Sequence, residues 1–168
     1  MIVMQLRPLL PKDAPLMLEW MHDAGVVGHM GTNFMEKTLA DCQSFIQWAQ
    51  TAKQDLHLAI VDEDDVYMGT VSLKHIANSS AEFAITVRAC AMGKGFSAFG
   101  MDSILRKGLL EMGMKTIYWC VSPDNKRAVR FYDKHGYRRV DVATLTPQGY
   151  TPEQLSYFIW YAVTKEDL

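Results

Sequence analysis

The spacing of apolar residues changes from helical to extended along the first half of the chain. Over residues 12–22 and 38–53, apolar side chains recur every three or four positions, which predicts two amphipathic helices. Apolar and polar residues then alternate, and this predicts strands over 56–61 and 66–75 joined by the acidic turn EDD. A short strand is also predicted over residues 2–7, ahead of the first helix.

The second half alternates between extended and helical patterns. Its first segment, FAITV, is rich in the β-branched and aromatic residues that favour strands. Strands are predicted over 81–87, 116–121, 137–143 and 156–163, and helices over 96–112 and 124–135. This order predicts an α/β fold in which helices cover both faces of a mixed sheet, organised as one domain over residues 1–168.

Capping residues mark the expected helix ends. Asp13 and Thr38 can cap the first two helices, because their side-chain oxygens accept hydrogen bonds from free backbone N–H groups. Either Asp124 or Asn125 can cap the last one. Gly136 suits the left-handed residue that closes a helix, since it has no Cβ.

The composition is that of a globular protein, with 49% hydrophobic and 21% charged residues. The longest apolar run, residues 157–163, is far shorter than the ~20 residues of a membrane helix, and no secretory signal is visible at the start. Cys42, Cys90 and Cys120 form no CxxC pair, which argues against a disulfide framework or a zinc ribbon. A reducing cytoplasm is therefore expected, with no membrane partner.

Charge is distributed unevenly along the sequence. The formal charge is −6 over residues 1–87, +7 over 88–139 and −3 over 140–168, which gives a net charge of −2. A net charge of −2 makes a general nucleic-acid binder an unlikely class, because such proteins carry a basic excess. The basic middle segment indicates either a local site for a polyanion or scattered solvated charge.

A glycine-containing loop, MGKG, connects the predicted strand 81–87 to the helix that begins near Phe96. Glycines let a ligand approach the backbone, and the free N–H groups at a helix start attract anions. Arg88 and Lys94 add positive charge. The loop is neither a Walker A motif nor a dinucleotide fingerprint, so it is a phosphate cradle or a plain strand-to-helix turn.

The helix in PDNKRAVRFYDKHGY carries Asn125 and Tyr132 on one face, because helical residues about one turn apart are neighbours. Both side chains could reach one cleft. The alternative is that Phe131 and Tyr132 are ordinary core aromatics.

Together the two segments resemble the GNAT superfamily of acetyl-CoA-dependent acyltransferases, most specifically over residues 81–140. Met92 stands where this family's pyrophosphate loop has Arg or Gln, and Ser97 where it has Gly or Ala. The second motif matches at Asn125, Ala128, Phe131, Tyr132, Lys134 and Gly136. More weakly, the N-terminal segment resembles the branch of ribosomal-protein N-terminal and amino-sugar N-acetyltransferases. The resemblance implies a central, mostly antiparallel mixed sheet of about seven strands flanked by helices.

The resemblance also implies a mechanism, in which an amine attacks the thioester of acetyl-CoA directly. Tyr132 is then the acid that protonates the departing thiolate. Glu82 is the best-placed base, acting through water, although it could instead fix a neighbouring strand or loop by a hydrogen bond. The implied cofactor-binding residues are Ile85, Val87, Met92, Gly93, Lys94, Gly95, Phe96, Ser97, Asn125 and Arg130.

The acceptor side is expected in the N-terminal half, where residues 23–37 are predicted as an ordered loop with a short helical turn. Aromatic and polar groups there suit a polar ring carrying a primary amine, such as an amino sugar. The candidate acceptor-binding residues are Trp20, His22, His29, Met30, Asn33 and Phe34. Phe45 and Trp48, in contrast, are predicted to lie in the core. The alternatives are the N-terminal amine of a protein, and a non-catalytic acyl-CoA-binding module.

Other chemistry is less favoured. No histidine is placed to activate Cys90 or Cys120 as an acyl acceptor, so both are predicted to be buried structural thiols. His22, Asp23 and His29 lack a metal-ligand spacing, so no metal is expected. The expected partner is a small-molecule amine, and the chain could also pair with a second copy of itself as a homodimer.

Overall fold

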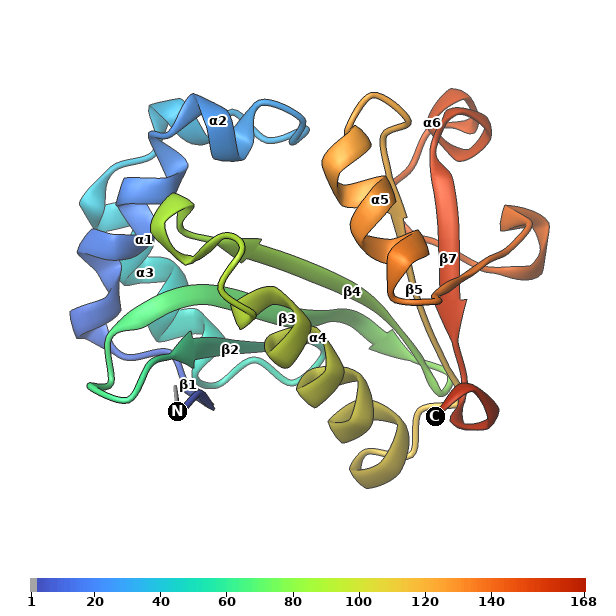
Figure 1. Ribbon diagram of the computed structural model, residues 1–168, viewed down its shortest axis with the longest axis horizontal. Coiled ribbons are helices and arrows are strands. Elements are labelled where there is room, and N and C mark those ends of the chain that lie inside the picture. Colours follow the sequence, from blue (N-terminus) through green and yellow to red (C-terminus); the bar gives the residue numbers. More distant parts are fainter. Residues whose placement is uncertain (1–2) are drawn as a thin grey trace.

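The computed structural model describes residues 3–168 and is built around one seven-stranded sheet (Figure 1). The strands are β1 (Gln5–Pro8), β2 (Leu56–Val61), β3 (Tyr67–Ala77), β4 (Ser80–Val87), β5 (Thr116–Val121), β6 (Arg138–Arg139) and β7 (Ile159–Val163). Their order is β1-β2-β3-β4-β5-β7-β6, and only β4 and β5 are parallel neighbours. The mixed, mostly antiparallel sheet is therefore confirmed. The predicted start of the first strand at Ile2 lies outside the described residues.

Helices cover both faces of this sheet, as predicted (Figure 1). The helices are α1 (Ala14–Met21), α2 (Ala24–Val27), α3 (Leu39–Ala49), α4 (Phe96–Arg106), α5 (Lys126–Lys134) and α6 (Pro152–Tyr157). On one face, α1 and α3 enclose a core that includes Met17, Ile46 and Tyr67. On the other, α4 and α5 pack on a larger core that includes Ile104 and Trp119.

Two glycines let α4 and its continuation lie directly on the sheet. A Cβ at Gly100 would come within 2.4 Å of Ile60 Cδ1, and one at Gly108 within 2.7 Å of Ile117 Cδ1. Any larger residue would therefore push the helix away from the strands. Beyond Arg106 the predicted long helix continues as a π-helical turn over Lys107–Glu111. This close packing fixes where α4 begins, at the end of the MGKG loop.

Three of the predicted caps are confirmed. Thr38 accepts a hydrogen bond from the backbone of Asp41, and Asn125 caps α5 by accepting from Ala128 N at 3.2 Å. Gly136 follows α5 with a φ of 78°. Asp13 differs, because its carboxylate accepts from Leu10 N at 2.8 Å and so stabilises the 3₁₀ turn Pro11–Asp13 ahead of α1.

Several predictions at the chain's surface and C-terminal end were wrong. The strand predicted over 137–143 pairs only at Arg138 and Arg139, because a 3₁₀ turn follows at Val142–Thr144. The start of the strand predicted over 156–163 belongs to α6 instead. Trp48 and Phe45 were predicted in the core, but Trp48 is 51% exposed and its ring is tilted against that of half-buried Phe45.

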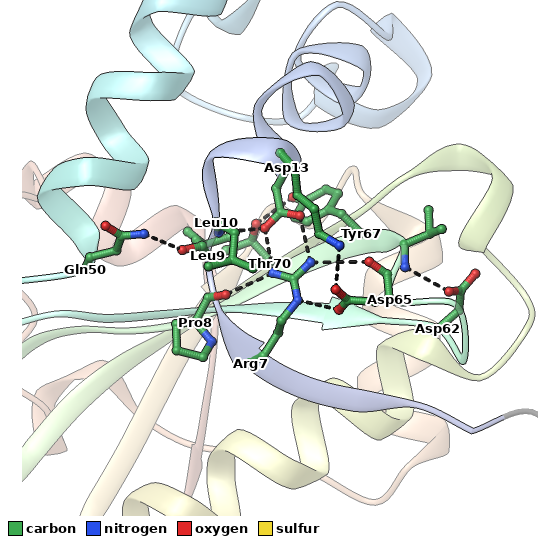
Figure 2. A network of polar contacts seen from close by, with 12 residues as sticks. Arg7, Pro8, Leu9, Leu10, Asp13, Gln50, Asp62, Asp65, Tyr67 and Thr70 are labelled. Atoms are coloured by element: carbon green, nitrogen blue, oxygen red, sulfur yellow. Dashed lines mark hydrogen bonds and ion pairs between the residues drawn. The ribbon is translucent and has the colours of Figure 1, made fainter.

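An ionic network fixes the N-terminal strand to α1 and to the β2–β3 turn (Figure 2). The Arg7 guanidinium donates to both carboxylate oxygens of Asp13 at 2.8 Å, and its Nε donates to Asp65 at 2.6 Å. Asp13 is only 1% exposed, so its charge has little water and depends on Arg7. Lys12 also pairs with Asp65, but at the surface.

Arg7→Met should therefore destabilise the fold by about 3 kcal/mol or more, since it leaves the Asp13 charge buried without its partner. Lys12→Met is the matched control, and because that pair is half exposed it should cost less than about 1 kcal/mol. Urea unfolding followed by circular dichroism measures both. Equal losses in the two variants would contradict the burial argument.

Candidate active site

The parallel strands β4 and β5 separate partway along their length, which opens a wedge in the middle of the sheet (Figure 1). They pair only from Ser80↔Thr116 to Glu82↔Tyr118, whereas β4 stays paired with β3 as far as Val87. The edge of β4 beyond Glu82 therefore has no strand partner on the β5 side. Ile85 and Val87, predicted to contact a cofactor, lie on this unpaired stretch. Backbone groups there are available to a ligand.

The MGKG loop follows directly and ends at the start of α4. Gly93 and Gly95 both adopt left-handed backbone conformations, with φ of 75° and 91°. A Cβ at Gly93 would meet nothing within 4 Å, so the loop is open there. Of the side chains that the structure describes, none caps α4, so the first N–H groups of this helix are available to an anion. Of the other predicted residues, Phe96 is buried, Lys94 is exposed and Ser97 is half-buried.

Helix α5 brings a further positive charge to this loop. Arg127 Nη1 lies 2.9 Å from Met92 Sδ, which brings an exposed guanidinium against the loop. The predicted Arg130 is also exposed, one turn further along α5. Arg88 is engaged elsewhere, since it donates to both carboxylate oxygens of Glu19 at 2.9 and 3.1 Å. Arg88 therefore holds α1 to the end of β4.

Tyr132 on α5 lies in an aromatic cluster over β5 and β7. Its ring centroid is 5.4 Å from Trp119 and 5.1 Å from Tyr161. Burial raises the pKa of Tyr132 above its usual value, so its hydroxyl is protonated at neutral pH. Among the residues described, none forms a hydrogen bond with that hydroxyl. Its proton is therefore free for another acceptor.

Glu82 lies at the point where β4 and β5 separate, and it is only 3% exposed. Its Oε2 accepts a hydrogen bond from Tyr150. Tyr150 in turn accepts from Cys120 Sγ at 3.4 Å, and Oε1 of Glu82 lies 3.3 Å from His75 Nδ1. From its sequence position, Glu82 was predicted to be either a base or a residue that fixes a neighbouring strand or loop by a hydrogen bond. The hydrogen bond to Tyr150 gives it the second role, and it does not exclude the first.

The candidate acceptor residues divide into exposed and buried ones. His22, His29 and Asn33 are exposed, whereas Met30 and Phe34 are half-buried. Trp20 is 5% exposed, donates to Tyr67 Oη at 2.9 Å and meets the Phe34 ring edge-on. Trp20 therefore packs beneath Phe34 and supports the loop that contains it. Contact between the acceptor and any of these residues stays a prediction.

The two cysteines of interest differ in their surroundings. Burial raises the pKa of Cys120 to about 11, so it is a thiol and a poor nucleophile at neutral pH. Cys90 was predicted to be buried but is exposed, because the 3₁₀ turn Ala89–Ala91 places it on the surface. Within residues 3–168, no group of three or more His, Cys, Asp or Glu side chains is arranged to hold a metal ion.

The site also contains three residues that no sequence motif predicts, namely Tyr150, His75 and Arg127. Tyr150 lies in the loop before α6 and is 68 positions from Glu82, so no local pattern could connect them. His75 reaches Glu82 only because its backbone is left-handed. Arg127 is one of several Lys and Arg residues on α5, and no sequence signal distinguishes it from the others. No helix in the described part of the chain has the length and apolar character to cross a membrane.

Comparison with known proteins identifies the fold and the family. The chain is similar to a spermidine N-acetyltransferase from Vibrio cholerae, crystallised with CoA and spermine, at 17% identity and a TM-score of 0.80 over 98% of this chain and 96% of that one. It is also similar to a GNAT-family acetyltransferase from Bacillus anthracis, at 19% identity and a TM-score of 0.75 over 99% of both chains. No curated protein matches it by sequence. The family model described as "Acetyltransferase (GNAT) domain" matches residues 4–138, and the chain accordingly belongs to the GNAT acetyltransferase family.

Proposed function

We propose that this acetyltransferase moves the acetyl group of acetyl-CoA directly to the primary amine of a small polar acceptor, an amino sugar in particular. The observation that carries the proposal is the buried carboxylate of Glu82 at the opening between β4 and β5. A module that only binds acyl-CoA has no use for a buried base beside the place where an amine would enter.

The residues present fit acetyl-CoA. Gly93 and Gly95 leave the MGKG loop open, and the uncapped N-terminus of α4 offers N–H groups for a pyrophosphate. Arg127 and Lys94 add positive charge beside it. The unpaired edge of β4 offers backbone groups for the pantetheine arm, near Ile85 and Val87. Asn125 uses its Oδ1 to cap α5, which leaves its amide N–H₂ group for a ligand or water.

The side chains supply the proton transfers that the reaction needs. Acetyl-CoA brings an activated thioester carbonyl. Glu82 accepts a proton from the amine through water, which makes the nitrogen nucleophilic. Tyr132 keeps its proton at neutral pH, because burial raises its pKa, and it donates that proton to the departing thiolate. One group is a base and the other an acid, as amine acetylation requires.

The class of acceptor is inferred from the acidic side chains of the N-terminal half. The chain's first 87 residues are acidic, but Asp13 and Asp65 bind Arg7, and Glu19 binds Arg88. The remaining acidic residues attract a cationic amine, and the aromatic side chains beside polar ones in the N-terminal half suit a polar ring that carries it. The spermidine N-acetyltransferase among its structural neighbours makes a polyamine the second candidate.

The test is an acceptor panel assayed by release of free CoA thiol. It compares a free amino sugar, a nucleotide-linked amino sugar, an aminoglycoside, spermidine and a peptide with a free N-terminus. The proposal expects the highest kcat/KM for an amino sugar. A kcat/KM for spermidine or the peptide above every amino sugar would overturn the acceptor class. Tight acetyl-CoA binding without thiol release for any acceptor would favour a non-catalytic module.

A further inference from the structure

Acetylation of an amine releases a proton that must leave the site. An acceptor that arrives as an ammonium loses two N–H protons on its way to the amide, and the thiolate takes up only one. The remaining proton goes to solvent once in every turnover, and it starts from Glu82 if the proposed function holds. Glu82 is 3% exposed, so it needs a route to water.

His75 lies on such a route. Its Nδ1 is 3.3 Å from Glu82 Oε1, close enough for an ion pair but without the geometry of a hydrogen bond. This nitrogen is one of two buried side-chain polar atoms that lack a hydrogen-bond partner among the residues described. The His75 side chain as a whole is 38% exposed, so the imidazole connects the buried carboxylate to the surface.

The backbone directs this imidazole toward Glu82. Lys74 is the direct partner of Glu82 in the β3–β4 register, so in a regular strand His75 would face the opposite side of the sheet. The register is irregular between Lys74 and Ala77, and His75 has a φ of 53°. Its backbone N–H donates to Asp55 Oδ1 at 3.1 Å, which stabilises the left-handed conformation. Irregularities that redirect a side chain are common beside functional sites.

The second oxygen of Glu82 is already occupied. Tyr150 donates its hydroxyl proton to Oε2, and burial together with the neighbouring Cys120 and Glu82 raises the pKa of Tyr150, so this donor stays protonated. Oε1 is then the oxygen that exchanges a proton, and it is the one that faces His75.

Charged and titratable groups surround His75 on several elements. Glu82 faces it from β4, and Asp55 holds its backbone from the segment before β2. Lys74 precedes it on β3, while Tyr150 and Cys120 lie on the far side of Glu82. Two carboxylates, Glu82 and Asp55, therefore lie beside this partly exposed imidazole.

We propose that His75 is a positioning residue that takes the transferred proton from Glu82 and releases it to solvent. The O–H bond at Glu82 Oε1 breaks as an N–H bond forms at His75 Nδ1, which gives an imidazolium. The Nε2–H bond then breaks, and its proton goes to water. Rotation of the ring then exposes Nδ1 to water, where Nδ1 loses its proton and Nε2 gains one, which restores the original tautomer; no electrons are transferred.

His75→Asn tests this route, because Asn tolerates a positive φ and cannot carry the proton. The first turnover, measured by quenched flow, should keep the wild-type rate, while steady-state kcat falls about tenfold because Glu82 is slow to lose its proton. KM for both substrates should stay within about twofold of wild type, since proton release follows binding. Added imidazole should restore kcat by replacing the missing ring.

Three comparisons make the result decisive. Glu82→Gln should slow the first turnover itself and gain nothing from imidazole. His135→Gln, an exposed histidine after α5, should leave both phases unchanged. The side-chain nitrogen signals of His75 in NMR spectra should move in Glu82→Gln, whatever the enzyme's activity. A His75→Asn enzyme with unchanged kcat, or with an equally slowed first turnover, would overturn the proton route, whereas an inactive wild type would overturn the proposed function.

Discussion

Tyr132→Phe should lower kcat by about 10²–10⁴-fold, the range that a general acid contributes, while acetyl-CoA affinity stays close to wild type. The substitution keeps the ring that packs on Trp119 and Tyr161. Within the described residues, the lost hydroxyl is bonded to nothing, so its removal leaves no polar group unpaired. The expected loss is therefore chemical and not structural.

Tyr137→Phe is the matched control for Tyr132→Phe. Tyr137 belongs to the same aromatic cluster, with its ring centroid 5.2 Å from Trp119, and burial raises its pKa as well. Its loss of a hydroxyl should leave kcat within about twofold of wild type. Because burial also raises the pKa of Tyr132, the wild-type enzyme should not lose its acid before at least about pH 10. An unchanged kcat in Tyr132→Phe, in an assay limited by chemistry, would make Tyr132 a packing residue.

Local sequence signals were sufficient for most of the fold. Thr38, Asn125 and Gly136 mark helix ends through contacts within a few residues, so their roles follow from the sequence. The apolar alternation over 66–75 likewise gave β3. The end of the chain was harder, because Tyr137 to Val142 alternates like a strand but meets β7 at only two positions. Whether a strand finds a partner is a tertiary property.

The candidate site was only partly predictable for the same reason. The MGKG loop and Tyr132 belong to contiguous motifs, and motif spacing places them. Tyr150 and His75 reach Glu82 through a long-range contact and a left-handed residue, and neither leaves a pattern in the sequence. Trp48 shows the opposite error, since a large aromatic on an amphipathic helix is expected inside but here is exposed, with its ring tilted against that of buried His57.

Gly95→Asp should weaken acetyl-CoA binding at least about 100-fold. The residue follows Lys94 at the start of α4, where the free N–H groups of the helix would meet the pyrophosphate. Two unit charges about 4 Å apart near a protein surface repel by about 4 kcal/mol, and each 1.4 kcal/mol is a factor of ten in affinity. Isothermal titration calorimetry with acetyl-CoA measures the loss, and higher salt should reduce the difference between Asp and wild type because it screens the charge.

Gly95→Asn separates this charge from the strain of the backbone. Gly95 has a φ of 91°, so any side chain is strained there, and Asn and Asp have nearly the same shape. Among residues 3–168, a Cβ at this position would meet only Met4 Cε, at 3.6 Å, so both variants should fold. If pyrophosphate binds at the MGKG loop, the Asn variant should lose much less affinity than the Asp variant. Equal affinity in Gly95→Asp and wild type would place the phosphates elsewhere, and Arg127 and Lys94 would then lose their assigned role as well.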